Sequence, residues 1–153
     1  SVAAVQQLLQ TTLGDVEVGP YLTKLCNSLA TSMIRNERLL SLKVEADATT
    51  VTSQEAVSLG LIVTELVINA LKHAFPGDRG GDVAVVYRAD AAGWTLSVED
   101  NGVGRNITRT KTKGGLGTVI VDSLAQQLGA TVLFSDLTPG LRVSVKGNPR
   151  PSA

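Results

Sequence analysis

Cysteine and aromatic residues are scarce in this chain. The single cysteine, Cys26, cannot form an internal disulfide, which fits a reducing compartment. Aromatic residues make up only 3% of the chain, whereas hydrophobic residues make up 43%, so the core must be built from Val, Leu, Ile and Ala. Cys26 lies in an apolar helical pattern, and no nearby group would lower the pKa of its thiol. We therefore expect a buried, inert thiol and not a nucleophile.

An excess of charge is also missing. Fourteen Lys and Arg residues balance 14 Asp and Glu residues, which argues against broad binding to nucleic acid or to an anionic membrane. No signal peptide is visible, and no apolar run is expected to be long enough to span a bilayer. These absences predict a cytoplasmic chain that is not embedded in a membrane and binds no nucleic acid.

The 153 residues are enough for one domain with its own core. Residues 2–13 carry apolar side chains at helical spacing, but so short a helix is not stable alone. It either packs on the domain or ends a longer helix, and the start at Ser1 instead of Met favours the second. We expect residues 1–14 to be a helix end, 15–147 the domain, and 148–153 a disordered tail.

The periodicity of the chain predicts three helices and five strands. The helices are expected at residues 19–35, 52–74 and 118–129, and the strands at 40–45, 82–89, 94–98, 130–134 and 141–145. Pro20 suits a first helical position, and Thr52 with Glu55 forms a capping box at the start of the second helix. The antiparallel hairpins and segregated helices predict an α+β fold: a two-layer α/β sandwich with a mixed, mostly antiparallel sheet packed on about three helices.

Residues 61–75 are the most informative stretch. Glu65, Asn69, Lys72 and His73 share one helix face, and their spacings make them neighbours. The opposite face is apolar and holds Val63, Leu66, Val67, Ala70, Leu71 and Ala74. A core helix with a solvated face is one explanation. However, a solvated face usually repeats Glu, Lys and Gln, whereas this stripe combines a carboxylate, an amide and two possible cations. The stripe is more typical of the wall of a polar cleft.

Two glycine-bearing segments follow in the sequence. Asp100, Gly102 and Gly104 come at the end of a strand, where a carboxylate can accept a hydrogen bond from an exocyclic amine and glycines allow a ring or phosphate to approach the backbone. Gly115 and Gly117 come at the start of a helix, whose free N–H groups suit phosphate. Each segment alone is a common turn sequence. Neither the dinucleotide-binding pattern nor a P-loop is present.

The segment between them, residues 105–113, contains four basic residues and no acidic one. We expect a mobile loop with glycine hinges whose positive charge lies over a polyphosphate, although a plain solvated loop would have the same composition. Asn69 supplies an uncharged oxygen suited to Mg²⁺, which usually also binds substrate phosphates.

Together these segments resemble the motifs of a known ATP-binding superfamily. Glu65-Leu-Val-Ile-Asn-Ala-Leu-Lys-His-Ala74 resembles the N box shared by gyrase, Hsp90, sensor histidine kinases and MutL, the GHKL proteins with the Bergerat fold. Asp100-Asn-Gly-Val-Gly104 resembles their first glycine box, and Gly114-Gly-Leu-Gly117 their second, at the end of the ATP lid. The resemblance covers about residues 20–147. It is closest to the catalytic domain of bacterial sensor histidine kinases, in the subgroup common behind PAS- and LOV-type sensors.

The resemblance implies a role for each matching residue. Asp100 would bind the adenine amino group, and Asn69 would hold Mg²⁺, with Glu65 acting on the metal through water. Lys72 and His73 would face the phosphates. Glu65 and Asn69 are the implied catalytic residues. The remaining ATP-binding positions are Gly102, Gly104, Lys113, Gly115, Leu116, Gly117 and Thr118.

The implied activity is transfer of the γ-phosphoryl group of ATP to a histidine, for relay to a response regulator. The only histidine here is His73, inside the N box, so the phosphoacceptor would lie elsewhere, on dimerisation helices of the same homodimeric kinase. A Phe-rich box is missing, and a Trp-x-Glu signature is not matched at Val98-Glu99. An anti-sigma-factor-type serine kinase, a GHKL ATPase and a nucleotide- or partner-binding module without turnover remain as alternatives.

Overall fold

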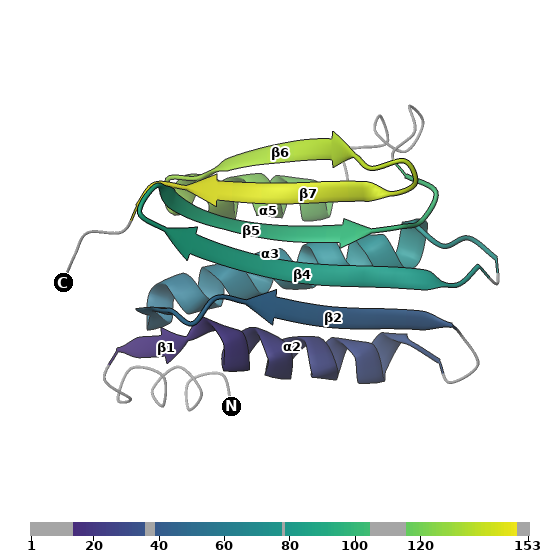
Figure 1. Ribbon diagram of the computed structural model, residues 1–153, viewed down its shortest axis with the longest axis horizontal. Coiled ribbons are helices and arrows are strands. Elements are labelled where there is room, and N and C mark those ends of the chain that lie inside the picture. The colour runs from purple at the N-terminus through teal and green to yellow at the C-terminus, as the bar shows by residue number, and fades with distance from the viewer. Residues whose placement is uncertain (1–13, 36–38, 78, 105–115, 150–153) are drawn as a thin grey trace.

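The computed structural model describes residues 14–35, 39–77, 79–104 and 116–149. In this part of the chain a five-stranded sheet has the order β2-β4-β5-β7-β6 (Figure 1). Only the β2–β4 pair is parallel. The strands are β2 (Leu40–Ala46), β4 (Gly81–Asp90), β5 (Gly93–Asp100), β6 (Thr131–Asp136) and β7 (Leu141–Gly147).

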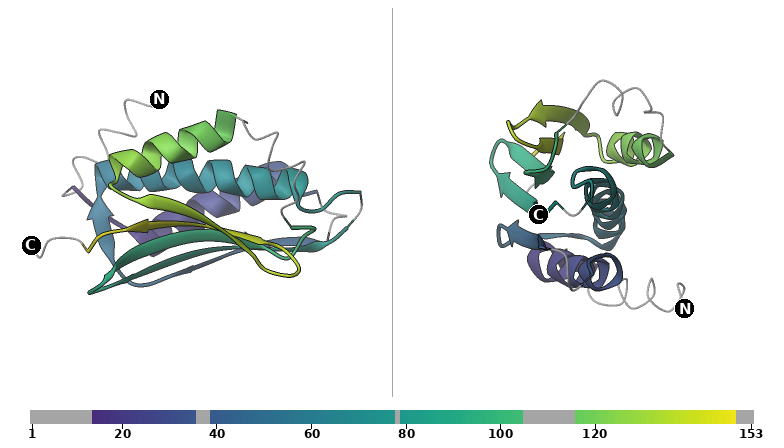
Figure 2. Two further views of the ribbon diagram at one scale, coloured as in Figure 1. Left: turned by 90° about the horizontal axis from the view of Figure 1, so that it is seen from above. Right: turned by 90° about the vertical axis from the view of Figure 1, so that its right-hand side faces the viewer.

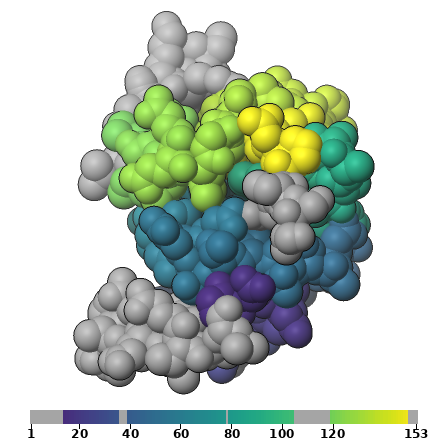
Figure 3. Space-filling model, turned by 90° about the vertical axis from the view of Figure 1, so that its left-hand side faces the viewer, coloured from purple at the N-terminus to yellow at the C-terminus, as the bar shows by residue number. Residues whose placement is uncertain are grey.

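Three helices cover one face of this sheet (Figure 2). They are α2 (Val18–Met33), α3 (Ser53–His73) and α5 (Leu116–Gln127). The space-filling view shows blue residues, which include the first part of α3, between α5 (green) and the purple residues at and just before the start of α2 (Figure 3). The predicted α+β sandwich, with its mixed and mostly antiparallel sheet, is confirmed.

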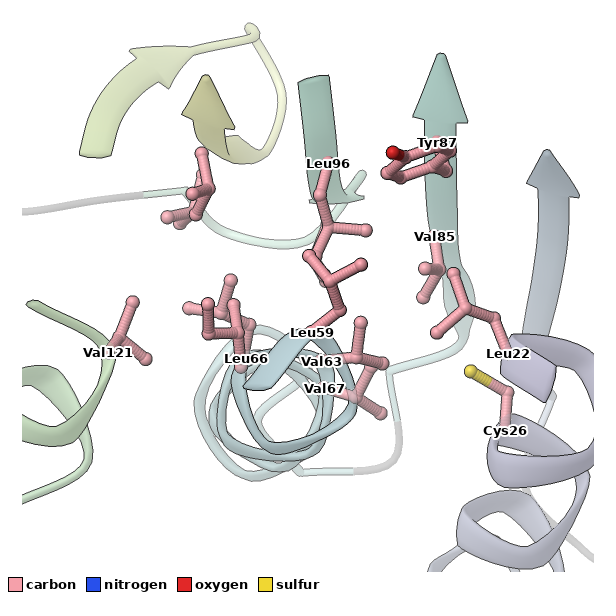
Figure 4. Packing of buried hydrophobic residues seen from close by; sticks show 14 of the residues in the cluster. Leu22, Cys26, Leu59, Val63, Leu66, Val67, Val85, Tyr87, Leu96 and Val121 are labelled. Carbon is pink, nitrogen blue, oxygen red and sulfur yellow. The ribbon is translucent and has the colours of Figure 1, made fainter. Parts of the chain in front are cut away.

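The central helix α3 begins at the capping box that the sequence predicts. The Glu55 N–H donates to Thr52 Oγ1 at 3.1 Å, and the Thr52 N–H donates to Glu55 Oε1 at 3.1 Å. The predicted apolar face is buried: Val63 and Val67 are fully covered and lie on the side of α3 toward α2, while Leu59 points toward the sheet (Figure 4). Burial of this apolar face holds α3 in the middle of the helix layer.

The expectation that no apolar run could span a bilayer was too strict for α3. The helix has 21 residues and a mean hydropathy of 1.4 over its most apolar 18 residues. By length and composition alone, α3 could therefore cross a membrane. Its place in the fold is nevertheless that of a core helix, because it packs on the sheet between the two other helices (Figure 2).

The start of α2 also differs from the prediction. The helix begins at Val18, two residues before Pro20, because the Val18 N–H donates to the carbonyl oxygen of Thr49, which is distant in sequence. Pro20 is tolerated there since the first helical N–H groups have no partner within the helix. Thr49 precedes β3 (Thr50–Thr52), which pairs antiparallel with β1 (Asp15–Glu17) in a second, two-stranded sheet that the sequence did not predict.

Val, Leu, Ile and Ala form most of the core between the layers, as the composition predicts. Tyr87 and Trp94 add a stacked ring pair with centroids 6.1 Å apart. Cys26 is 2% exposed, and burial raises the pKa of its thiol to about 11, which suits an inert core residue.

Candidate functional site

The polar stripe of α3 lies on the flank that faces α5. Gly60 packs against Tyr21 of α2, so that flank of α3 faces α2. Leu66 lies on the opposite flank, beside Val121 of α5 (Figure 4). Asn69 follows Leu66 by three residues and therefore shares its flank.

The four polar residues of the stripe are not equally exposed. Glu65 and Asn69 are half-buried, whereas Lys72 and His73 are exposed. A merely solvated face would leave all four exposed, so the first two sit in a more enclosed environment. At the helical period His73 also lies on the α5 side, whereas Lys72 points most directly away from the sheet. Among the described residues, no ion pair involves Glu65, Lys72 or His73.

Asp100, the last residue of β5, is buried, with 6% of its surface exposed. Its Oδ1 accepts a hydrogen bond from the Gly102 N–H at 2.9 Å. The next residues pack on the end of α3, where the Val103 N–H donates to the carbonyl oxygen of Ala74 at 2.9 Å. A side chain at Gly102 would overlap that same oxygen. The first glycine segment therefore lies beside the C-terminal turn of α3, close to His73.

The second glycine segment is only partly described. Lys113 and Gly115 lie outside the described residues, as does the expected mobile loop over residues 105–113. Leu116, Gly117 and Thr118 form the first turn of α5. Figure 2 shows α5 antiparallel to α3, so the start of α5 lies at the end where α3 finishes. Three elements that are distant in sequence thus converge at one end of the helix layer.

Sequence reasoning missed one residue at this end, Gly140 in the β6–β7 turn. Gly140 has a φ of +111°, and a Cβ there would overlap the carbonyl oxygen of Asp100. Gly104, with a φ of +82°, packs against the same turn, because its missing Cβ would lie 3.2 Å from the Gly140 carbonyl oxygen. The Pro139-Gly140 sequence predicts a turn, but nothing local indicates that the turn supports Asp100.

Known proteins share this architecture. A histidine kinase domain from the Erythrobacter litoralis EL346 blue-light activated histidine kinase superposes with a TM-score of 0.77 at 28% identity, over 86% of this chain and 64% of that one. The Acinetobacter baumannii histidine kinase AdeS has a TM-score of 0.70 over 97% of this chain and 76% of its own, but at 15% identity it supports the fold alone.

The relatives found by sequence are also protein kinases. Blue-light-activated histidine kinase 2 of Erythrobacter litoralis (strain HTCC2594) is 32% identical over 118 residues, which are 75% of this chain but only 33% of that protein. The serine-protein kinase RsbW of Listeria innocua is 31% identical over 83 residues, 54% of this chain and 53% of its own. The chain therefore spans between a third and about half of these relatives.

The family model for "Histidine kinase-, DNA gyrase B-, and HSP90-like ATPase" matches residues 54–149, which include all of α3 but its first residue, the Asp100 segment and α5. This range is well over half of the 153 residues. The chain belongs to this family and is an ATP-binding domain of the GHKL type.

Proposed function

We propose that this chain is the catalytic domain of a sensor histidine kinase. It transfers the γ-phosphoryl group of ATP to a histidine outside these 153 residues, and a response regulator then receives it. The observation that carries the proposal is the convergence of the Asn69 flank of α3, Asp100 and the start of α5 at one end of the helix layer. The 32% identity with a blue-light-activated histidine kinase supports this class of kinase.

In this proposal Asp100 selects the adenine base. Its Oδ1 accepts a hydrogen bond from the Gly102 N–H, and because a carboxylate has about four acceptor positions, this bond leaves an adenine amino group able to donate to the same carboxylate. Because Asp100 is buried, such a bond is shielded from water. Gly102 and Gly104 shape the pocket, because their lack of side chains lets the turn after Asp100 pack on Ala74 and Gly140.

Mg²⁺ fits the oxygen donors of the α3 stripe. Asn69 offers a half-buried amide oxygen, and Glu65, one turn earlier, can act through a bound water. Mg²⁺ favours oxygen ligands and keeps waters and substrate phosphates in its shell, so one or two side chains suffice. When bound, the ion would neutralise developing charge on the transferred phosphoryl group.

The remaining residues position the phosphates. The first turn of α5, Leu116, Gly117 and Thr118, presents backbone N–H groups at a helix start. His73 lies nearby on the α5 side. The flexible side chain of Lys72 would allow its ammonium group to reach the phosphates beside the first turn of α5. Lys113 and Gly115 would complete this half of the site. Glu65 would orient the acceptor imidazole, since phosphoryl transfer depends mainly on positioning and charge stabilisation.

The acceptor histidine would be on dimerisation helices of the same kinase, and residues 1–14 would be the end of one of them. Residues 15–147 would be the catalytic domain in the cytoplasm, and residues 148–153 its tail. The match to RsbW keeps a second candidate open, a serine kinase with the same nucleotide site.

Calorimetric titration with ATP and ADP, with and without Mg²⁺, tests the site. We expect saturable binding that weakens at least about tenfold in Asp100→Asn, the size of one well-placed hydrogen bond. The amide retains the acceptor for the Gly102 N–H, so the turn should persist. Asp122→Asn, an exposed carboxylate on α5, is the matched control. Absence of binding by the wild-type chain would overturn the proposal.

Phosphotransfer separates the two kinase candidates. Radiolabelled ATP is supplied with a fragment carrying kinase dimerisation helices, or with an RsbW-type serine substrate protein. An acid-labile product on the helices indicates phosphohistidine and supports a histidine kinase, whereas an acid-stable product on the second protein indicates the serine kinase. Tight ATP binding without either product would favour a binding module.

A further inference from the structure

Asn101, the residue after Asp100, is hydrogen-bonded to the neighbouring strand β4. The Asp82 N–H donates to Asn101 Oδ1 at 2.8 Å, and Asn101 Nδ2 donates to Asp82 Oδ2 at 3.2 Å. The Asn101 N–H also donates to the Asp82 carbonyl oxygen at 3.3 Å. One amide side chain therefore both accepts from and donates to Asp82, which extends the β4–β5 ladder beyond its last pair, Val83 and Asp100.

The other oxygen of Asp82 reaches the next strand. Ser41 Oγ donates to Asp82 Oδ1 at 2.6 Å, and the two residues are register partners across the parallel β2–β4 pair. Gly81 leaves room for this arrangement, since a Cβ there would lie 2.6 Å from Asn101 Oδ1 and would overlap the Phe75 ring. The Ser41–Asp82–Asn101 network thus links β2, β4 and the end of β5.

The turn that carries Asp100 is consequently held from two sides. The Ser41–Asp82–Asn101 network holds it on the sheet side, and the bond from the Val103 N–H to the Ala74 carbonyl oxygen holds it on the α3 side. A hydrogen bond weakens steeply when its distance or angle changes, so a carboxylate that selects a base needs a fixed position.

We propose that Asn101, through Asp82 and Ser41, is a positioning residue for base selection: it fixes the Asp100 carboxylate where it accepts from the amino group of adenine and repels the carbonyl oxygen that guanine presents there. This inference rests on the proposed function and adds to it a determinant of the ATP-to-GTP preference. Asn101 and Asp82 are both exposed, so losing their bonds should change the local turn much more than the overall stability.

The test is a swap of the two residues. Asn101→Asp places two carboxylates face to face and removes the amide donor, so the ratio of the GTP dissociation constant to the ATP dissociation constant should fall about tenfold, a change of the size of one lost hydrogen bond. The double variant Asp82→Asn with Asn101→Asp reverses the donor while keeping the backbone N–H bond and an acceptor for Ser41. It should recover most of the ratio. Asn27→Ala, at an exposed position on α2, is the control.

Calorimetric titrations with ATP and GTP and the melting temperature are measured for each variant. A lower ratio in Asn101→Asp at a nearly unchanged melting temperature, with recovery in the double variant, supports the inference. An unchanged ratio in Asn101→Asp overturns it while the wild-type chain still binds ATP, so the proposed function stands. A ratio that falls but is not recovered by the swap also overturns it. No ATP binding by the wild-type chain overturns both.

Discussion

Gly140 lies outside every motif in the sequence, yet its backbone contacts the candidate site directly. Its φ of +111° and the overlap that a Cβ would make with the Asp100 carbonyl oxygen give two separate reasons for glycine. Gly140→Ala should therefore lower the free energy of unfolding by about 2 kcal/mol or more and weaken ATP binding, because Asp100 must move. Urea unfolding and calorimetric titration measure the two effects.

Gly129 provides the matched control for this change. It also has a positive φ, +67°, but no atom would lie within 4 Å of its Cβ. Gly129→Ala should cost about 1 kcal/mol from backbone strain alone and leave ATP binding unchanged. If Gly140→Ala costs no more than Gly129→Ala, the contact with Asp100 is not what requires glycine.

At the scale of one element, the capping box of α3 is open to a direct test. Thr52→Ala removes the side-chain acceptor for the Glu55 N–H and should lower the free energy of unfolding by about 1 kcal/mol. Thr23→Ala, at an exposed position inside α2, should be neutral or slightly stabilising, since alanine has the higher helix propensity. Equal effects of the two changes, measured by urea unfolding, would show that the cap contributes little.

The helices and long strands could be read from the sequence because their signals are local. The alternation over residues 82–89 reappears as buried Val83, Val85 and Tyr87, and the capping box reappears with both of its bonds. The strands β1 and β3 have three residues each and exist through pairing between Asp15–Glu17 and Thr50–Thr52, which no periodicity indicates. The early start of α2 depends on the distant Thr49 carbonyl for the same reason.

The residues of the candidate site also fall into two groups, those indicated by local sequence and those that act through long-range contacts. The roles proposed for Asn69 and Asp100 could be inferred from the sequence, because an amide on a polar helix stripe and a carboxylate at a strand end are local features. Gly140, Asp82 and Ser41 act through contacts between strands and turns that are far apart in the chain, so their part in the site appears only in three dimensions. Local patterns therefore identify the residues that would touch the ligand better than those that hold them in place.

At the scale of the whole molecule, the candidate site is made by the junction of separate elements. Asn69, Asp100 and the first turn of α5 lie on three different elements and meet only when the helix layer is packed on the sheet (Figures 1 and 2). The unfolded chain cannot reproduce this arrangement. A nucleotide that binds there should therefore stabilise the entire fold and not one loop.

This linkage gives a quantitative expectation for Mg²⁺ and ATP. At a free Mg²⁺–ATP concentration of about 100 times the dissociation constant, the free energy of unfolding should rise by about 2.7 kcal/mol. Asn69→Ala should lose the part of this gain that requires Mg²⁺ and keep the part given by ATP with a chelator, because Asp100 is intact. Urea unfolding with ATP, with and without Mg²⁺, measures both parts. If Asn69→Ala responds to Mg²⁺ as the wild-type chain does, the metal is held by other residues and the role of the α3 stripe must be reassigned.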